Sequence, residues 1–407
     1  MRAGGLPMPG GDRFSRQAAN LLIGLAGLLL MLLAAMAGHG WADRHFLPSF
    51  AFSRAFQLGL VDGLRLALGL VGLLLMLVVR PCVVRAIEAE RGRRAALRAL
   101  TLALAVFAAF AVAEIVLQNR AWHATQDRQD GKEPLRFADA RMGWTMAANH
   151  VGHATIDGRD IGYATDAFGY RSNGVPLDFA QPTIVFAGES ILLGYGLQEA
   201  ETIPGRVRAL TGLQTANISV NAHATDQSLM RLQSELPRFR HPVAVVIPFV
   251  PMLFDRNLDR DRPHLDAALT WHEAEPPALR LVELARRLLR YRSEAAIEEG
   301  VVMTRAVLRA AIAATERRGA RAIILVPQLQ PEDPTERAVR MRVLDEAHIP
   351  YLLVPLEPGW RLQVDRHPNV RGAEAIARAI VARLMADGVG FEPTVSVNPR
   401  RFSRPVP

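Results

Sequence analysis

The sequence is poor in cysteine, lysine and aromatic residues. Cys82 is the only cysteine among 407 residues, which excludes an intrachain disulfide and a zinc site built on several cysteines. Lys132 is the only lysine, so the net charge of +8 comes almost entirely from arginine. Aromatic residues make up 6% of the chain, and no basic run is interleaved with them. We therefore expect no nucleic-acid partner.

Long hydrophobic runs are abundant near the N-terminus. Half of all residues are hydrophobic, and three apolar stretches hold most of the excess. Each stretch is close to the ~20 residues that a helix needs to cross the hydrocarbon core of a bilayer. The pattern predicts an α-helical membrane region over residues 1–118, with three spans at about 20–38, 58–79 and 97–117.

The arginines predict the orientation of these spans. Arg13 and Arg16 precede the first span, six arginines lie between residues 80 and 98, and only Arg44 and Arg54 lie in the connection between the first two spans. Cytoplasmic loops carry the excess of positive charge, so three spans place the rest of the chain on the periplasmic or extracellular side of a bacterial inner (plasma) membrane. Ala35-Met36-Ala37 also resembles a signal-peptidase site, and cleavage there would leave this topology unchanged.

The remainder of the chain divides into four parts. Residues 119–135 are polar and typical of a linker. Residues 136–182 predict a β-rich lead-in with a hairpin that turns at Asp157-Gly158. Residues 183–388 alternate short apolar runs with helical patterns, and residues 389–407 form a C-terminal tail.

The alternating part predicts an α/β domain with a parallel sheet covered on both faces. We expect strands at residues 183–187, 214–220, 243–249, 322–326 and 351–354, and helices at 202–210, 226–236, 277–318, 334–347 and 371–385. Ligands of such sheets bind beyond the carboxyl ends of the strands. Residues that follow the strands are therefore the candidates for a site.

Ser190 comes just after the first predicted strand, and Asp365 and His367 come just before the last helix. A serine, a histidine and an aspartate are the groups that nucleophilic acyl transfer uses. Gly188 allows a tight turn and a close approach of substrate before the serine.

Two blocks carry a specific resemblance to a known family. "IVFAGESILLGYGL" and "VDRHPNVRGAEAIA" resemble the first and last blocks of the SGNH/GDSL hydrolase family, in the form found in membrane-associated bacterial members. "NISVNAHATDQ" and "VVIPFVPMLFDRN" stand where the second and third blocks belong. The resemblance covers about residues 136–388 and implies a three-layer, flavodoxin-like α/β domain.

The resemblance also implies roles for the candidate residues. Ser190 is the nucleophile, His367 the general base and Asp365 the residue that orients the imidazole. The backbone N–H groups of Ser190 and Ala222 form the oxyanion site, with Gly188 and Asn221 beside it. No metal or organic cofactor is implied.

Four positions depart from the family pattern. Ala222 stands where the family has a glycine, Met252 where it has an asparagine, Leu253 where an aspartate is usual, and Glu189 where an aspartate precedes the serine. An amide donor to an oxyanion is typically worth ~10²–10³ in rate, and methionine cannot supply one. Asn221 and Asn257 are the nearby residues that could take its place.

The sequence therefore predicts a membrane-anchored serine ester hydrolase or O-acyltransferase that acts outside the cytoplasm through an acyl-enzyme. Its setting suggests acylated envelope glycans or lipids, or smaller acylated molecules, as substrates. The loss of the amide donor leaves one alternative, a catalytically weakened binding or assembly protein of the cell envelope. The acyl group, the acceptor and the oligomeric state stay open.

Overall fold

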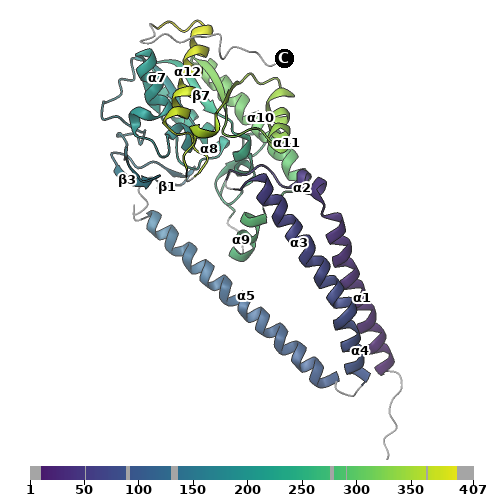
Figure 1. The fold of residues 1–407 in the computed structure, drawn as a ribbon. Helices are drawn as coiled ribbons and strands as arrows, with labels where there is room; N and C mark the ends of the chain where they lie inside the picture. The colour runs from purple at the N-terminus through teal and green to yellow at the C-terminus, as the bar shows by residue number, and fades with distance from the viewer. Residues whose placement is uncertain are drawn as a thin grey trace, which may run out of the picture. The chain divides into compact units, whose positions relative to one another are not determined.

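The computed structural model of the chain describes residues 11–50, 52–88, 92–129, 136–275, 279–289, 291–363 and 365–391. The predicted tail beyond residue 391 lies outside these residues. The chain divides into two compact units (Figure 1). One unit is helical and comprises Met1–Phe46, Phe52–Ala121 and Leu279–Tyr291. The other is an α/β unit that comprises Leu47–Ala51, Trp122–Ala278 and Arg292–Pro407.

The helical unit contains two helices that are long and apolar enough to cross a membrane, among the residues described. They cover Gln17–Met36 and Arg54–Arg85 and match the first two predicted spans. The third predicted span, residues 97–117, falls within α5, where part of the side chains lies outside the described residues. The helices of this unit are α1 (Gly11–Met36), α2 (His39–His45), α3 (Arg54–Leu74), the π-helical turn η1 (Leu75–Val79), α4 (Arg80–Glu88), α5 (Gly92–Gln129) and α9 (Arg280–Leu289).

Glycines let α1 and α3 pack at very short range. A Cβ at Gly27 would lie 2.7 Å from the carbonyl oxygen of Gly72, and a Cβ at Gly72 would lie 2.7 Å from that of Gly27. Small residues at such crossings are typical of helix pairs in membranes, where packing replaces the hydrophobic effect as the driving force.

The first part of the predicted linker is helical. Helix α5 continues to Gln129, so residues 119–129 are helical and residues 130–135 lie outside the described residues. The physical reason is that residues 119–129 contain neither glycine nor proline, the two residues that most often end a helix.

The α/β unit is built on a five-stranded parallel sheet, as predicted. The strand order is β11-β10-β7-β5-β6, which is the flavodoxin-like order. The strands are β5 (Pro182–Phe186), β6 (Gln214–Asn217), β7 (His241–Pro248), β10 (Arg321–Gln328) and β11 (Leu352–Pro355). The first of these strands in the chain, β5, lies inside the sheet between β6 and β7, so the direction in which strands are added reverses there.

Two hydrophobic cores cover the two faces of this sheet. Side chains alternate along each strand: Ile184 and Phe186 face one core, and Val185 faces the other. Helices α7 (Ile203–Thr211) and α12 (Val370–Ala386) close the first core, and α8 (Thr225–Glu235) and α10 (Glu294–Glu316) close the second (Figure 1). The unit therefore has three layers.

Two predicted helices differ from those observed. The helix predicted at 277–318 is two helices, α9 and α10, and Ser293 begins the second by accepting a hydrogen bond from the Ala296 N–H. The helix predicted at 334–347 is α11 (Pro334–Arg340) followed by a π-helical turn, η5 (Met341–Asp345). Two segments belong to a different unit from their neighbours in the chain: Leu279–Tyr291 belongs to the helical unit and Leu47–Ala51 to the α/β unit.

The lead-in forms two small antiparallel pairs, β1 (Phe137–Asp139) with β2 (Gly143–Thr145) and β3 (Val151–Ile156) with β4 (Arg159–Ala164). Ile156 pairs with Arg159, so Asp157 and Gly158 alone form the turn, with φ of 51° and 72°. Positive φ at both positions is the type I′ geometry that suits a two-residue hairpin. The predicted hairpin is confirmed. The remaining short elements are η2 (Glu199–Glu201), η3 (Leu236–Arg238), η4 (Pro251–Leu258), β8 (His264–Leu265), β9 (Trp271–His272) and η6 (Pro358–Trp360).

Glu336 is expected to make the stability of the α/β unit depend on pH. It is buried in the capping box at the start of α11, and burial, followed by the carboxylate of Asp333, raises the pKa of Glu336 to about 7 from its usual 4.5. Because the folded-state pKa is the higher one, the stabilising contribution is complete below about pH 4.5 and is lost as the pH rises through about 7.

The substitution Glu336→Gln keeps an acceptor for the capping box and removes the ionisation. We expect it to raise the thermal midpoint at pH 8 by about 2–4 °C and to leave the midpoint at pH 4 unchanged. Thermal unfolding of the full chain in detergent, followed by intrinsic fluorescence, measures both values. An equal shift at the two pH values would contradict a role for the ionisation.

Candidate active site

Ser190 lies where β5 ends and a short helix, α6 (Ser190–Leu193), begins. Glu189 is the residue before this helix, and its side chain accepts a hydrogen bond from the Ile191 N–H at 2.9 Å. Gly188 leaves no room for a side chain, since a Cβ there would lie 2.5 Å from Cγ of Pro248. The strand end, the glycine and the capped helix together place the serine at the carboxyl edge of the sheet.

His367 meets Ser190 across 177 residues of sequence. The His367 Nε2 lies 2.8 Å from Ser190 Oγ, and both residues are buried. Asp365 Oδ2 lies 2.8 Å from His367 Nδ1. Asp365 Oδ1 accepts a hydrogen bond from the His367 N–H at 2.8 Å, which fixes the carboxylate to the loop. The structure thus brings Ser190, His367 and Asp365 together.

The electrostatics of the pair favour an ionised Asp365. Burial alone raises the pKa of Asp365, but the imidazole and the backbone N–H of His367 outweigh burial, so the pKa lies below its usual 3.8. The carboxylate is therefore charged throughout the pH range in which histidines usually titrate. A negative charge beside Nδ1 stabilises an imidazolium.

Glu189 competes with His367 for the serine hydroxyl. Its Oε2 lies 2.7 Å from Ser190 Oγ, while Nε2 of His367 lies at 2.8 Å. The hydroxyl has one proton and can donate to only one of these acceptors. Attack on a carbonyl requires the proton to pass to Nε2. The contact with Glu189 therefore belongs to the site before it reacts, and the hydroxyl has to turn toward His367 for catalysis.

Two backbone N–H groups at this edge of the sheet are available to bind an oxyanion. The Ser190 N–H is the first of α6, and first-turn N–H groups have no partner within a helix. The Ala222 N–H donates no hydrogen bond within the part of the chain that the structure describes. Ala222 has φ of 64°, in the left-handed region that favours glycine.

The structure separates the candidates for the missing amide donor. Met252 is buried and packs in the core that α7 and α12 close. Asn257 is committed elsewhere, because it accepts from the Thr225 N–H at 3.0 Å and donates to Thr304 Oγ1 at 2.9 Å. The side chain of Asn221 is half-buried and has no hydrogen-bond partner among the described residues. Asn221 is thus the remaining candidate.

Several residues of the site were missed by sequence reasoning. The Tyr195 and Phe50 rings flank His367, with centroids 4.7 and 4.8 Å from the imidazole. Arg171 is buried and donates to the carbonyl oxygens of Leu193 and Gly194, both at 2.7 Å, and so holds the loop after the serine helix. Burial lowers the pKa of Arg171 to about 10, which leaves it charged at neutral pH.

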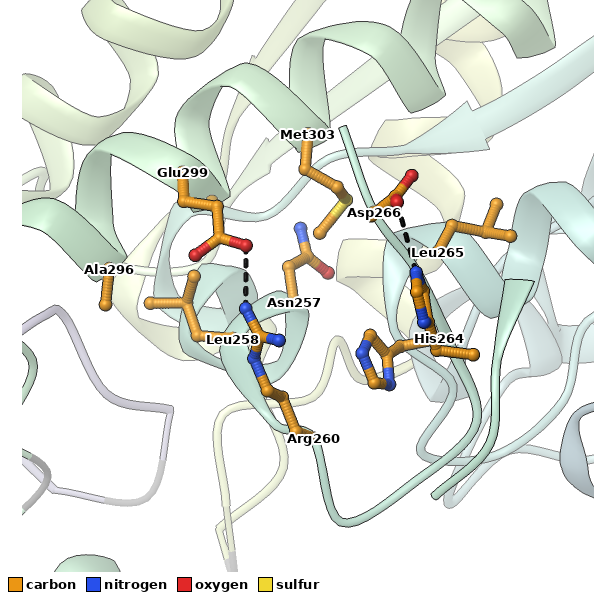
Figure 2. A pocket seen from close by; sticks show the side chains of 11 residues that line it. Asn257, Leu258, Arg260, His264, Leu265, Asp266, Ala296, Glu299 and Met303 are labelled. Carbon is orange, nitrogen blue, oxygen red and sulfur yellow. Dashed lines mark hydrogen bonds and ion pairs between the residues drawn. The ribbon is translucent and has the colours of Figure 1, made fainter. Parts of the chain in front are cut away.

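A separate cavity of about 60 Å³ lies elsewhere in the α/β unit (Figure 2). The ion pair between Arg260 and Glu299 forms one wall, and His264 and Asp266 lie on the other. None of Ser190, His367 and Asp365 lines this cavity. Groups of three or more metal-ligating side chains are absent from the described residues as a whole.

The fold and the site define a class, an α/β protein with a serine, a histidine and an aspartate in the arrangement that acyl transfer uses. No protein-family model and no curated protein matches the sequence. A solved structure of a protein of the lipolytic G-D-S-L family from Desulfitobacterium hafniense DCB-2 is similar over 49% of this chain and 97% of its own, with 10% identity and a TM-score of 0.31. A member of the same family from Veillonella parvula DSM 2008 is similar over 50% of this chain and 97% of its own, with 13% identity and a TM-score of 0.29.

Proposed function

We propose that the protein is a serine ester hydrolase or O-acyltransferase. The observation that carries the proposal is the contact of 2.8 Å between Ser190 Oγ and His367 Nε2, with Asp365 at 2.8 Å from Nδ1. Nucleophile, base and orienting carboxylate within such distances are the signature of an activated serine.

The reaction follows from this geometry. Ser190 Oγ attacks the ester carbonyl carbon as its proton passes to Nε2, and the N–H groups of Ser190 and Ala222 donate to the oxyanion. The tetrahedral intermediate collapses, the C–O bond to the alcohol breaks, and Nε2 returns the proton to the leaving oxygen. Water or a sugar hydroxyl then gives its proton to Nε2 and attacks the acyl carbon, the bond from that carbon to Ser190 Oγ breaks, and Nε2 returns the proton to Oγ. Water completes hydrolysis, and a sugar hydroxyl completes transfer.

We further propose that α5 is the third membrane span. Residues Leu47–Ala51, between α2 and α3, belong to the α/β unit, and Arg366 donates to the Ser49 carbonyl oxygen at 2.8 Å. This supports placing that connection and the α/β unit on one side of the membrane. If α3 and α4 cross the membrane, the chain has to cross back before residue 136, and α5 is the helix available. The arginine distribution favours the side outside the cytoplasm for the α/β unit.

This location favours acylated glycans or lipids of a bacterial envelope as substrates. The alternative is a catalytically weakened binding or assembly protein. Two observations favour it: Met252, which stands where the resemblance implies an amide donor, is packed in the core, and Glu189 accepts from the serine hydroxyl.

A covalent probe distinguishes the two functions. The full chain, purified in detergent, is treated with a fluorophosphonate, and the modified peptide is identified by mass spectrometry. We expect one adduct, on Ser190, together with turnover of a small acetyl ester. Added glycan acceptor should divert the acyl group from water if the protein is a transferase. Folded protein that forms no adduct and retains affinity for an acylated glycan would support the binding protein and overturn the enzyme.

A further inference from the structure

The residue at the candidate oxyanion site has a costly backbone conformation. Ala222 has φ of 64°, in the left-handed region where the Cβ of an L-residue is crowded by the following carbonyl oxygen. Such conformations persist only where the surroundings hold them. The peptide groups on both sides of Ala222 are held by side chains from other segments.

The first holding contact comes from the lead-in. Trp144, in β2, donates its Nε1–H to the Asn221 carbonyl oxygen at 2.8 Å. That carbonyl and the Ala222 N–H belong to the same planar peptide group and point in opposite directions. The Trp144 bond therefore fixes the direction of the Ala222 N–H. A bond to the carbonyl also strengthens the N–H as a donor, because hydrogen bonds in a chain polarise one another.

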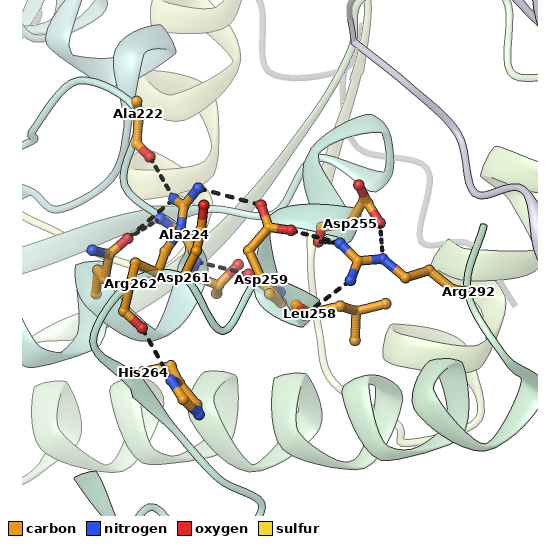
Figure 3. A network of polar contacts seen from close by, with 12 residues as sticks. Ala222, Ala224, Asp255, Leu258, Asp259, Asp261, Arg262, His264 and Arg292 are labelled. Carbon is orange, nitrogen blue, oxygen red and sulfur yellow. Dashed lines mark hydrogen bonds and ion pairs between the residues drawn. The ribbon is translucent and has the colours of Figure 1, made fainter. Parts of the chain in front are cut away.

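The second holding contact comes from Arg262, in the loop after η4. Its Nη1 donates to the Ala222 carbonyl oxygen at 3.1 Å (Figure 3). The Arg262 guanidinium also lies 5.3 Å from the centre of the Trp144 ring. The two holding side chains therefore contact each other as well as the loop.

Both side chains are themselves held. His223 Nε2 donates to the Trp144 carbonyl oxygen at 2.9 Å, and burial lowers the pKa of His223 to about 3, so its ring is neutral. Arg262 pairs with Asp259 at 3.3 Å, and the other oxygen of Asp259 accepts from Arg292 at 2.5 Å (Figure 3). Arg292 in turn donates to Asp255 at 2.7 Å, within η4. Arg262 is thus connected, through Asp259 and Arg292, to η4, the segment that follows β7.

We propose that Trp144 and Arg262 are positioning residues that hold Ala222 in its left-handed conformation and aim its N–H at the oxyanion. This inference rests on the proposed function. It explains how the chain holds an alanine in a left-handed conformation that a glycine would adopt without strain. Neither residue touches the reacting atoms.

The test uses Trp144→Phe in the full chain, which keeps an aromatic ring and removes the N–H donor. We expect kcat for a small acetyl ester to fall about 10-fold and the rate of fluorophosphonate labelling to fall in parallel, with KM changed by less than about 3-fold. The loss is smaller than the ~10²–10³ for a deleted oxyanion donor, because the Ala222 N–H is still present. Arg262→Lys, which cannot reproduce the planar fork of the guanidinium, is the second variant and should lower kcat in the same way.

Two further variants separate positioning from general damage. Trp271→Phe is the matched control, because Trp271 Nε1 donates to the Arg141 carbonyl oxygen at 2.9 Å, away from Ala222; its kcat should stay within about 2-fold of the wild type. Ala222→Gly should rescue Trp144→Phe, because glycine adopts positive φ without strain. An unchanged kcat in Trp144→Phe, or an equal loss with and without Ala222→Gly, would overturn the inference.

The conformation of residue 222 can also be determined directly, without an activity measurement. A crystal structure of Trp144→Phe in which Ala222 has left the left-handed region supports the inference, and one in which φ is unchanged overturns it. If the wild type forms no adduct on Ser190, the proposed function fails, and these structures still decide whether Trp144 holds the loop.

Discussion

The substitution His367→Ala is expected to lower kcat for ester turnover by about 10⁴–10⁶-fold. Nε2 is the group within reach of the Ser190 hydroxyl that can take its proton and later return it to the leaving oxygen. Without the imidazole, the hydroxyl keeps only Glu189 as a partner, and a carboxylate that also caps α6 is a poor proton carrier. Steady-state kinetics with an activated acetyl ester measures the loss.

Two comparisons make this result specific. Ser190→Ala should cost about as much, and the double variant Ser190→Ala/His367→Ala no more than either alone, because the two groups act as a unit. His153→Ala is the control: His153 lies 3.3 Å from Asp160 in an exposed pair on the lead-in hairpin, and its removal should leave kcat unchanged. Turnover above about a tenth of wild type in His367→Ala would exclude the imidazole as the base.

The substitution Asp365→Asn is expected to lower kcat by about 10²–10⁴-fold. An asparagine can still accept from the His367 N–H, as Oδ1 of Asp365 does at 2.8 Å. Its amide would donate to Nδ1, which forces the proton onto Nε2 and removes the base. The imidazolium also loses its negative neighbour, so we expect the acidic limb of the profile of kcat/KM against pH to move to lower pH. A profile of unchanged position and height would contradict a role for Asp365.

The same carboxylate is expected to contribute to stability. The pKa of Asp365 is lower in the folded protein than its usual 3.8, so the folded chain releases this proton more readily. Its stabilising contribution is therefore present above about pH 3.8 and is lost as the pH falls through the folded-state pKa. Acid unfolding of the wild type should be steeper below pH 3.8 than that of Asp365→Asn.

The sheet could be predicted because its strands carry a local signal. Runs such as residues 183–187 and 243–249 are almost continuously apolar, as parallel strands buried on both faces must be. The meeting of Ser190 and His367 was expected for two reasons: both follow strands of a parallel sheet, and the resemblance to the SGNH/GDSL family implies that they act together. Sequence analysis missed the break between helices before Ser293 and the continuation of α5 to Gln129. The pattern of apolar residues along the chain does not show where tertiary packing ends one helix or lets another continue.

The surroundings of the site carry no such signal. Trp144 lies 77 residues from Asn221 in the sequence, and Arg262 lies 40 residues from Ala222. Neither residue belongs to a motif, and each is an ordinary side chain until the fold brings it to the loop. The contact between Glu189 and Ser190 was missed for another reason. Adjacent side chains can point apart or together, and here the helix cap turns the carboxylate toward the hydroxyl.

The sequence by itself determined the order of strands and helices, the apolar helices near the N-terminus, and the serine and histidine that meet at the sheet edge. Periodicity and position relative to a strand end are local properties, and local properties can be read along the chain. Only the tertiary structure decided which groups hold the oxyanion loop, which acceptors share the serine proton, and that Met252 is buried in the core. Those outcomes depend on contacts between distant segments, which exist only once the sheet and its layers have packed.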